Sequence, residues 1–156
     1  MDPDAITQLI DRSFPGVDVV IGDEGIAEGD RFFFYDPDRS LDPRKRFPFA
    51  TIVTKDYGDF DRASNLNRPG IFRLNIGVSS ATFRALFGPQ ASPADASHDF
   101  AALDQLLPHP VYAPQSWICV LNPSEQTLQS IQPLLAEAYQ RAVRRHAQRS
   151  NETDKP

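Results

Sequence analysis

Arg73 and Asn75 are the residues whose types and spacing point most directly to binding chemistry. Both lie in the segment 71–78, where apolar and polar residues alternate. In an extended strand this alternation places Arg73 and Asn75 on one face and the apolar residues on the other. A guanidinium on such a face either meets solvent or a structural ion-pair partner, or it holds an anionic group through its planar set of N–H donors. The sequence leaves both interpretations open.

Aromatic residues in neighbouring segments would give this polar face apolar walls. The segment 32–35 is aromatic at four successive positions, so it places rings on both faces of a sheet. Trp117 falls on the opposite face from Ile118 and Val120. Rings on both faces imply that the face away from the helices is also covered, by loops, by a partner subunit or by a bound apolar ligand. The sequence therefore predicts a small-molecule pocket, with simple core packing of the rings as the alternative. The predicted ligand-binding residues are Tyr35, Arg73, Asn75, Tyr112 and Trp117.

His109 is the candidate acid or base of this predicted pocket. Pro108 and Pro110 bracket it and restrict the backbone on both sides. The imidazole would be held rigidly at the pocket mouth, and histidine is the side chain whose charge changes most readily near neutral pH. A purely structural histidine is the alternative.

Motifs for metals and cofactors do not occur in the sequence. Asp56, Asp59 and Asp61 share a polar loop, but their spacing fails the calcium-loop pattern. No two of the three histidines have ligand spacing, and the single cysteine, Cys119, is interpreted as inert packing in a strand. We therefore expect no metal and no cofactor.

The composition indicates one globular domain that carries a net negative charge. The chain has 156 residues and a formal net charge of −5. One core is expected at this length, so we predict a single domain over residues 1–147 and a disordered polar tail over 148–156. The negative charge makes nucleic acid an unfavoured partner, because Lys and Arg supply most of the affinity for phosphates.

The sequence also favours a cytoplasmic location. No apolar run approaches the length that spans a bilayer, and the first residues lack the character of a signal peptide. A single cysteine agrees with a reducing compartment. We expect no contact with a membrane.

Apolar periodicity assigns the elements that must position the candidate residues. Helical spacing predicts helices over 3–14, 79–87, 100–107 and 124–146. Segments rich in β-branched and aromatic residues predict about five strands, over 17–21, 31–35, 47–54, 71–78 and 116–121. Pro133 lies off the apolar side of the last helix and is expected to bend it. The predicted fold is α+β, a mainly antiparallel sheet with helices packed on one face.

The order of these elements resembles a known family. A strand that carries Trp117, followed by an amphipathic terminal helix, resembles the MmcQ/YjbR-like family of small bacterial proteins, most strongly over 109–143. Three blocks more closely resemble a bacterial family catalogued only as a domain of unknown function: 47–54 (FPFATIVT), 68–78 (RPGIFRLNIGV) and 109–112 (HPVY). The resemblance implies a frataxin-like antiparallel sheet with helices on one side, and it implies no activity.

Three function hypotheses follow. The first is a small-molecule pocket on the sheet face opposite the long C-terminal helix, for a small anionic or aromatic ligand. It would serve binding alone or a modest acid/base reaction in which His109 moves the proton and Arg73 orients an anionic group. The second is a protein-interaction or homodimerisation module that uses the same face or the loop 36–46. The sequence does not decide whether the chain is an enzyme.

The third hypothesis, DNA binding, comes from the resemblance alone. MmcQ/YjbR-like proteins have been suggested to bind DNA through a double-wing arrangement, which would need basic, exposed hairpins. Only the loop 36–46 offers basic residues, and three aspartates in the same loop offset most of their charge.

Overall fold

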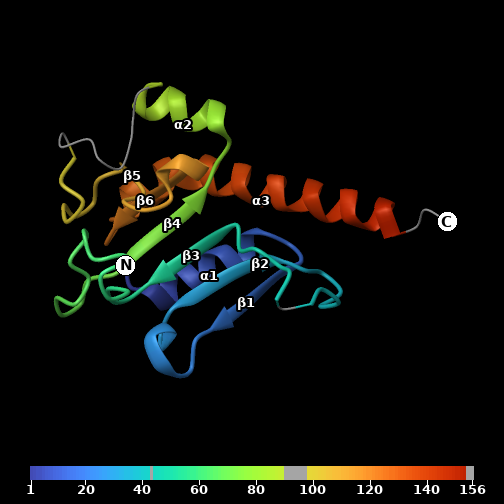
Figure 1. Cartoon of the computed structure of the whole chain (residues 1–156), viewed down its shortest axis with the longest axis horizontal. Helices are drawn as coiled ribbons and strands as arrows, with labels where there is room; N and C mark the ends of the chain where they lie inside the picture. The colour runs from blue at the N-terminus through green and yellow to red at the C-terminus, as the bar shows by residue number, and fades with distance from the viewer. Residues whose placement is uncertain (43, 90–97, 154–156) are drawn as a thin grey trace.

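An antiparallel sheet forms the centre of the fold. The computed structural model describes residues 1–42, 44–89 and 98–153. Within them, six strands pair in the order β1-β2-β3-β4-β6-β5, and every neighbouring pair is antiparallel (Figure 1). The strands are β1 (Val17–Ile21), β2 (Arg31–Tyr35), β3 (Ala50–Val53), β4 (Arg73–Gly77), β5 (Leu107–Pro108) and β6 (Trp117–Leu121). The predicted α+β class is confirmed, with one strand more than the five expected.

The two faces of the central strand β4 have different chemistry, as the alternation in its sequence predicts. Leu74 and Ile76 point into the hydrophobic core and have no exposed surface. Arg73, Asn75 and Gly77 point to the other face, because successive side chains alternate along a strand. The strand registers then set the neighbours of each of these residues across the sheet. Asn75 lies between Thr51 of β3 and Cys119 of β6, and Gly77 lies beside Trp117.

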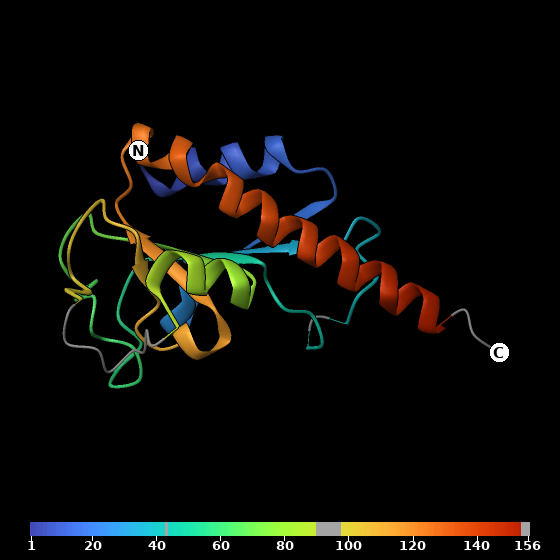
Figure 2. The same ribbon diagram turned by 90° about the horizontal axis from the view of Figure 1, so that it is seen from above.

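Two helices cover the apolar face of the sheet. α1 (Pro3–Ser13) and α3 (Glu125–Thr153) lie on the same side of it in Figure 2. α1 begins at Asp2, whose carboxylate accepts the Ala5 N–H at 2.8 Å, an N-cap bond that satisfies a free backbone donor. α3 runs through Pro133 and buries a stripe against the sheet: Leu128, Ile131, Leu135 and Ala138.

The third helix, α2 (Ser80–Phe87), follows β4 directly. Ser79 caps it by accepting the Thr82 N–H at 3.1 Å. The hydroxyls of Ser79 and Thr82 both donate to Glu137 of α3, at 2.9 and 2.7 Å, and Phe83 joins the core. These bonds fix α2 beside α3. The helix predicted over 79–87 is confirmed.

Residues 100–107 do not form the predicted helix. Asp104 has a φ of 58°, in the left-handed region that interrupts a right-handed helix, and its N–H donates to Leu121 O at 2.7 Å. Leu107 is buried and pairs with β6, so this segment supplies the sixth strand, β5. Leu107 is therefore apolar because it is buried at the sheet edge, whereas Leu103 of the same segment is exposed.

The C-terminal end of the last helix differs from the prediction. α3 continues to Thr153 and extends past the sheet in Figure 1, so residues 148–153 are helical where a disordered tail is predicted. Residues 154–156 lie outside the described part of the chain. The same holds for residues 90–97 of the predicted linker.

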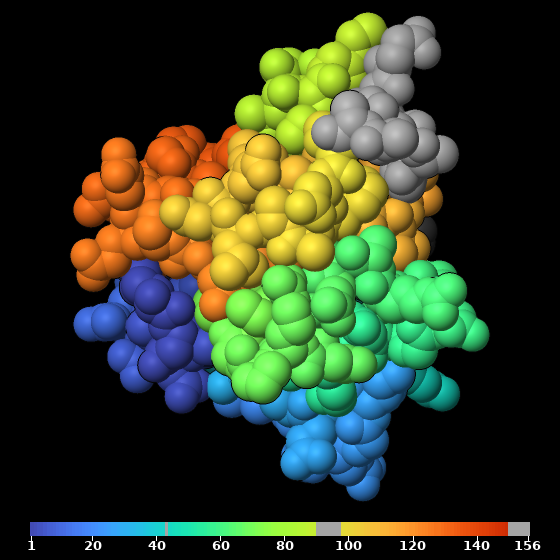
Figure 3. Space-filling view, turned by 90° about the vertical axis from the view of Figure 1, so that its left-hand side faces the viewer, coloured from blue at the N-terminus to red at the C-terminus, as the bar shows by residue number. Residues whose placement is uncertain are grey.

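A long loop, residues 54–72, covers part of the sheet face opposite the helices. Leu66 at its centre is buried against Val53 and Leu121. Arg68 donates to the carbonyl of Ala101 at 3.1 Å, and Figure 3 shows this green loop packed beside the yellow segment that follows residue 97. The 54–72 loop is therefore held by its own small hydrophobic cluster.

Candidate functional site

A cavity of about 580 Å³ opens on the sheet face opposite α1 and α3. Its floor belongs to β3, β4 and β6, and its walls come from the 54–72 loop, the segment before β3 and the turn between β5 and β6. The aromatic lining residues are Phe32, Phe47, Tyr57, Phe60, Tyr112 and Trp117. The polar lining residues are Thr51, Asp61, Arg73, Asn75, His109 and Gln115. Pockets for small ligands fall in the range of roughly 300–1,000 Å³.

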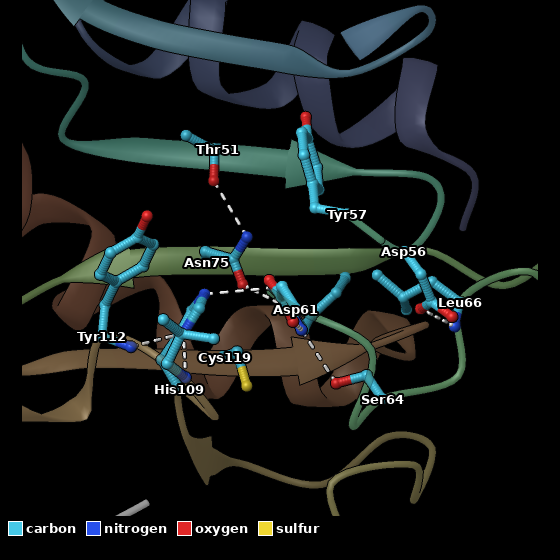
Figure 4. A network of polar contacts seen from close by, with 12 residues as sticks. Thr51, Asp56, Tyr57, Asp61, Ser64, Leu66, Asn75, His109, Tyr112 and Cys119 are labelled. Carbon is cyan, nitrogen blue, oxygen red and sulfur yellow. Dashed lines mark hydrogen bonds and ion pairs between the residues drawn. The ribbon is translucent and has the colours of Figure 1, made fainter. Parts of the chain in front are cut away.

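Arg73 lies in the polar floor and forms a buried ion pair with Asp61. Figure 4 shows Asp61, Ser64, Asn75 and His109, the residues that surround its guanidinium. The Arg73 side chain has no exposed surface, and Asp61 of the 54–72 loop is also buried. The pair is bidentate: Nη2 donates to Asp61 Oδ2 at 2.5 Å and Nη1 to Oδ1 at 3.1 Å. Charge-assisted pairs of this geometry are among the strongest polar contacts in proteins. The charge of Arg73 is therefore already balanced inside the protein.

The remaining donors of Arg73 are also occupied. Nη1 donates to Ser64 Oγ at 2.9 Å, and Nε donates to Asn75 Oδ1 at 2.8 Å. Nη2 lies 3.2 Å from His109 Nε2. A guanidinium has five N–H groups; four of them donate to Asp61, Ser64 and Asn75, and the fifth, on Nη2, faces His109 Nε2. Arg73 thus organises the floor, and it could take an anionic ligand only by giving up an existing contact.

His109 fixes the turn between β5 and β6. Its Nδ1 accepts the backbone N–H groups of Val111 and Tyr112, at 3.0 and 2.9 Å, while Nε2 faces the guanidinium of Arg73. Burial, and then the positive charge of Arg73, lower the pKa of His109 to about 3. The imidazole is therefore neutral near pH 7. Its hydrogen bonds place Tyr112, whose ring centroid is 5.0 Å away, at the cavity wall.

Asn75 continues the network toward β3. It accepts from Arg73 and donates from Nδ2 to Thr51 Oγ1 at 3.0 Å. An amide nitrogen carries two N–H groups, so one of them remains after the bond to Thr51. Cys119, the next residue in the same row across the sheet, is fully buried, and burial raises the pKa of its thiol to about 12. The interpretation of Cys119 as inert packing agrees with this environment.

Trp117 lies against Gly77 at one end of the floor. A methyl group placed on Gly77 would stand 3.0 Å from both Cε2 and Cζ2 of the indole, which is closer than ordinary contact. Glycine at position 77 therefore lets the indole rest directly on the sheet. Because Trp117 also lines the cavity, its ring forms part of the inner wall.

Three aromatic side chains surround the mouth of the cavity. Phe47 is 69% exposed, Phe60 63% and Tyr112 43%. Phe60 and Tyr112 come from different loops, and their ring centroids are 6.1 Å apart. Exposed apolar groups gathered at one place commonly mark a binding surface.

Tyr35 does not belong to this site, which corrects the predicted set. Its ring packs on the helix face, with centroids 5.6 Å from Tyr139 and 5.2 Å from His146 of α3. The register explains the error, because Phe32 of β2 pairs with Thr51 and so shares its face, and Tyr35 has the opposite parity. The structure brings the other predicted residues, Arg73, Asn75, His109, Tyr112 and Trp117, around one cavity.

Several residues of the site were missed by the sequence reasoning. Asp61 and Ser64, the partners of Arg73, lie in the 54–72 loop. For Asp61 the sequence predicts only that its spacing does not fit a calcium loop. Asp30 is fully buried and accepts hydrogen bonds from the Tyr57 hydroxyl and from Thr54. A buried arginine on a strand face implies an acidic partner, but the sequence does not identify which acidic residue forms the pair.

Neither a cluster of metal ligands nor a helix able to span a membrane occurs in the described part of the chain. In the ranges 1–42, 44–89 and 98–153, no three side chains of His, Cys, Asp or Glu are grouped as metal ligands. None of the helices described is both long and apolar enough to cross a bilayer.

The fold and site define an α+β protein with an aromatic-walled cavity above a buried polar network. The chain belongs to a family of unknown function, DUF6194, which matches residues 1–151. The predicted likeness to a domain of unknown function agrees with this match. No curated protein and no solved structure matches the chain, so no match supports the MmcQ/YjbR-like assignment.

Proposed function

We propose that this protein binds a small molecule in the cavity on the sheet face opposite α3. The observation that carries the proposal is the lining, in which six aromatic side chains stand around a floor of hydrogen-bonded polar groups. Apolar walls with a few fixed polar groups are the usual form of a ligand site. The floor is rigid because Asp61, Ser64 and His109 hold Arg73 in place.

Binding is favoured over acid/base chemistry at His109. A general acid or base works best when its pKa is near the working pH, and burial beside Arg73 lowers the pKa of His109 to about 3. Both ring nitrogens also face N–H groups. His109 is therefore proposed as a positioning residue that holds Tyr112, and Arg73 as the centre of the floor.

A fragment screen by ligand-observed NMR tests the proposal. We expect fragment hits to lose most of their binding to the variant Phe60→Ala, because Phe60 is a wall residue. Phe60 is also largely exposed, so its removal leaves the core intact. Leu86→Ala, an exposed position on α2 away from the cavity, is the matched control and should keep the hits. The proposal is wrong if no fragment binds, or if both variants keep every hit.

Protein interaction is the second candidate function, favoured by the exposure of Phe47, Phe60 and Tyr112 around the mouth. A second copy of the chain or another protein would bury these rings. Light scattering coupled to size exclusion tests the homodimer: a dimer that Phe60→Ala dissociates supports it, and a monomer at all concentrations excludes it.

DNA binding is opposed by the ion pairs of the loop 36–46. Arg46 donates to Asp18 at 2.8 Å and to Asp36 at 3.1 Å, and its side chain is only 11% exposed. Arg44 pairs with Asp42 at 3.4 Å. Cations that are paired in this way bind phosphates less readily.

The MmcQ/YjbR-like assignment, a bacterial source and a cytoplasmic location stay predictions from the sequence.

A further inference from the structure

We propose that the cavity selects an uncharged, planar aromatic ligand that carries a carbonyl-type acceptor. This inference rests on the proposed binding function and specifies its ligand class. It replaces the small anionic ligand expected when Arg73 is considered without its partners.

The charges at the cavity disfavour an anion. Arg73 is fully paired with Asp61, and His109 is neutral. Asp30, which accepts from the hydroxyl of the lining residue Tyr57, takes three hydrogen bonds in all and has no cationic partner among the described residues. The formal charges of Arg73, Asp61 and Asp30 thus sum to one negative charge. A carboxylate that enters would lose its hydration without gaining a counter-ion, which is costly.

The aromatic walls favour a flat ring. Trp117 rests on Gly77, so its indole cannot move toward the sheet. Phe60 and Tyr112 stand at the mouth. Aromatic pairs gain about 0.5–1.5 kcal/mol beyond the area they bury, so a planar ligand uses this lining better than a saturated one of equal size.

The polar groups left over at the cavity are mainly donors. Asn75 keeps one amide N–H and Thr51 keeps its hydroxyl proton, since Thr51 accepts in their mutual bond. Within the described residues, the Trp117 indole N–H and the Tyr112 hydroxyl make no hydrogen bond to another side chain or to the backbone. Donors that line an apolar cavity are satisfied best by an acceptor such as a neutral carbonyl oxygen.

A matched pair of compounds tests the ligand class. We would titrate the ¹⁵N-labelled protein with 2-naphthamide and, separately, with 2-naphthoate. Trp117 is the only tryptophan in the chain, so its indole N–H signal is unambiguous, and the Asn75 amide signals provide a second readout. We expect 2-naphthamide to shift both and to bind at least about tenfold more tightly than 2-naphthoate, a difference of ~1.4 kcal/mol.

Variants of the cavity floor test whether 2-naphthamide binds at this site. Gly77→Ala should push the indole into the cavity and weaken 2-naphthamide binding about tenfold. If that variant does not fold, Trp117→Leu should weaken binding similarly, with the Asn75 signals as readout. The Leu86→Ala variant should bind like the unmodified chain.

The outcomes separate this inference from the binding function. If 2-naphthoate binds as tightly as 2-naphthamide and shifts Trp117, the ligand class is wrong and the pocket stands. If neither compound shifts Trp117 or Asn75, the inference is overturned, and the fragment screen decides the binding function separately.

Discussion

At the scale of single residues, the buried pair of Arg73 and Asp61 dominates the site. Arg73 is completely enclosed, and every nitrogen of its guanidinium contacts a polar partner. Removing one member of such a pair leaves an uncompensated charge in the interior. Stability and the shape of the cavity floor therefore depend on the same residues.

The first prediction concerns Asp61→Asn. The change should lower the free energy of unfolding by about 3–5 kcal/mol, because it leaves the buried guanidinium without its counter-ion. Urea unfolding measures this loss. Asp59→Asn is the control, since the Asp59 side chain is 95% exposed in its pair with Arg62 and should change stability by less than about 1 kcal/mol. Equal effects of the two changes would contradict the account.

The second prediction concerns pH and His109. The folded chain has a His109 pKa of about 3, against the ordinary value of 6.5. Between these values the unfolded chain binds a proton that the folded chain does not, so stability falls as pH falls below 6.5. The contribution of His109 should drop by about 1.6 kcal/mol between pH 6.5 and 5, because the slope reaches its full ~1.4 kcal/mol per pH unit only where the unfolded histidine is mostly protonated.

Variants isolate this contribution of His109. His109→Asn keeps an acceptor for the turn and should lose this part of the pH slope, whereas His98→Asn should keep it. Urea unfolding at pH 6.5 and at pH 5 measures both slopes. The same slope in both variants would show that His109 is not the source.

At the scale of elements, the 54–72 loop forms one wall of the cavity. The loop supplies Tyr57, Phe60 and Asp61 to the cavity, and Leu66 anchors it in the small cluster with Val53 and Leu121. The fixed polar floor and the exposed mouth thus depend on the anchoring of one loop.

The third prediction tests that anchor. Leu66→Ala should cost about 2–5 kcal/mol of stability, as for other fully buried leucines. It should also weaken fragment binding, because the wall is less well held. Urea unfolding and the NMR screen measure the two effects. Leu103→Ala, at a 48% exposed leucine, is the control, and a similar small loss in both variants would contradict the proposed anchor.

Much of the element order could be predicted from the sequence because periodicity reports burial directly. The alternation in 71–78 placed Arg73 and Asn75 on one face, and the strand parity placed Trp117 there too. The prediction for Tyr35 is wrong because four consecutive aromatic residues do not reveal which of them face the helices and which face the cavity. The partners of Arg73 could not be predicted, since Asp61 reaches it through a loop whose path no local pattern encodes.

At the scale of the whole molecule, the sheet separates the main hydrophobic core from the proposed binding site. α1 and α3 cover one face with the main hydrophobic core. The other face carries the polar network and the cavity, and loops form its walls. Loops on a rigid scaffold are where binding residues usually lie. The long C-terminal helix can therefore stabilise the sheet without contacting the ligand.

A crystallographic fragment screen tests the central claim most directly. The account predicts that bound fragments appear in the cavity beside Trp117, within reach of Asn75 and Thr51. A second hollow of about 360 Å³ lies between α1 and α3, lined by residues that include Leu9, Phe14 and Pro133. Fragments found only in that hollow, or in neither place, would contradict the claim that the face opposite α3 is the binding site.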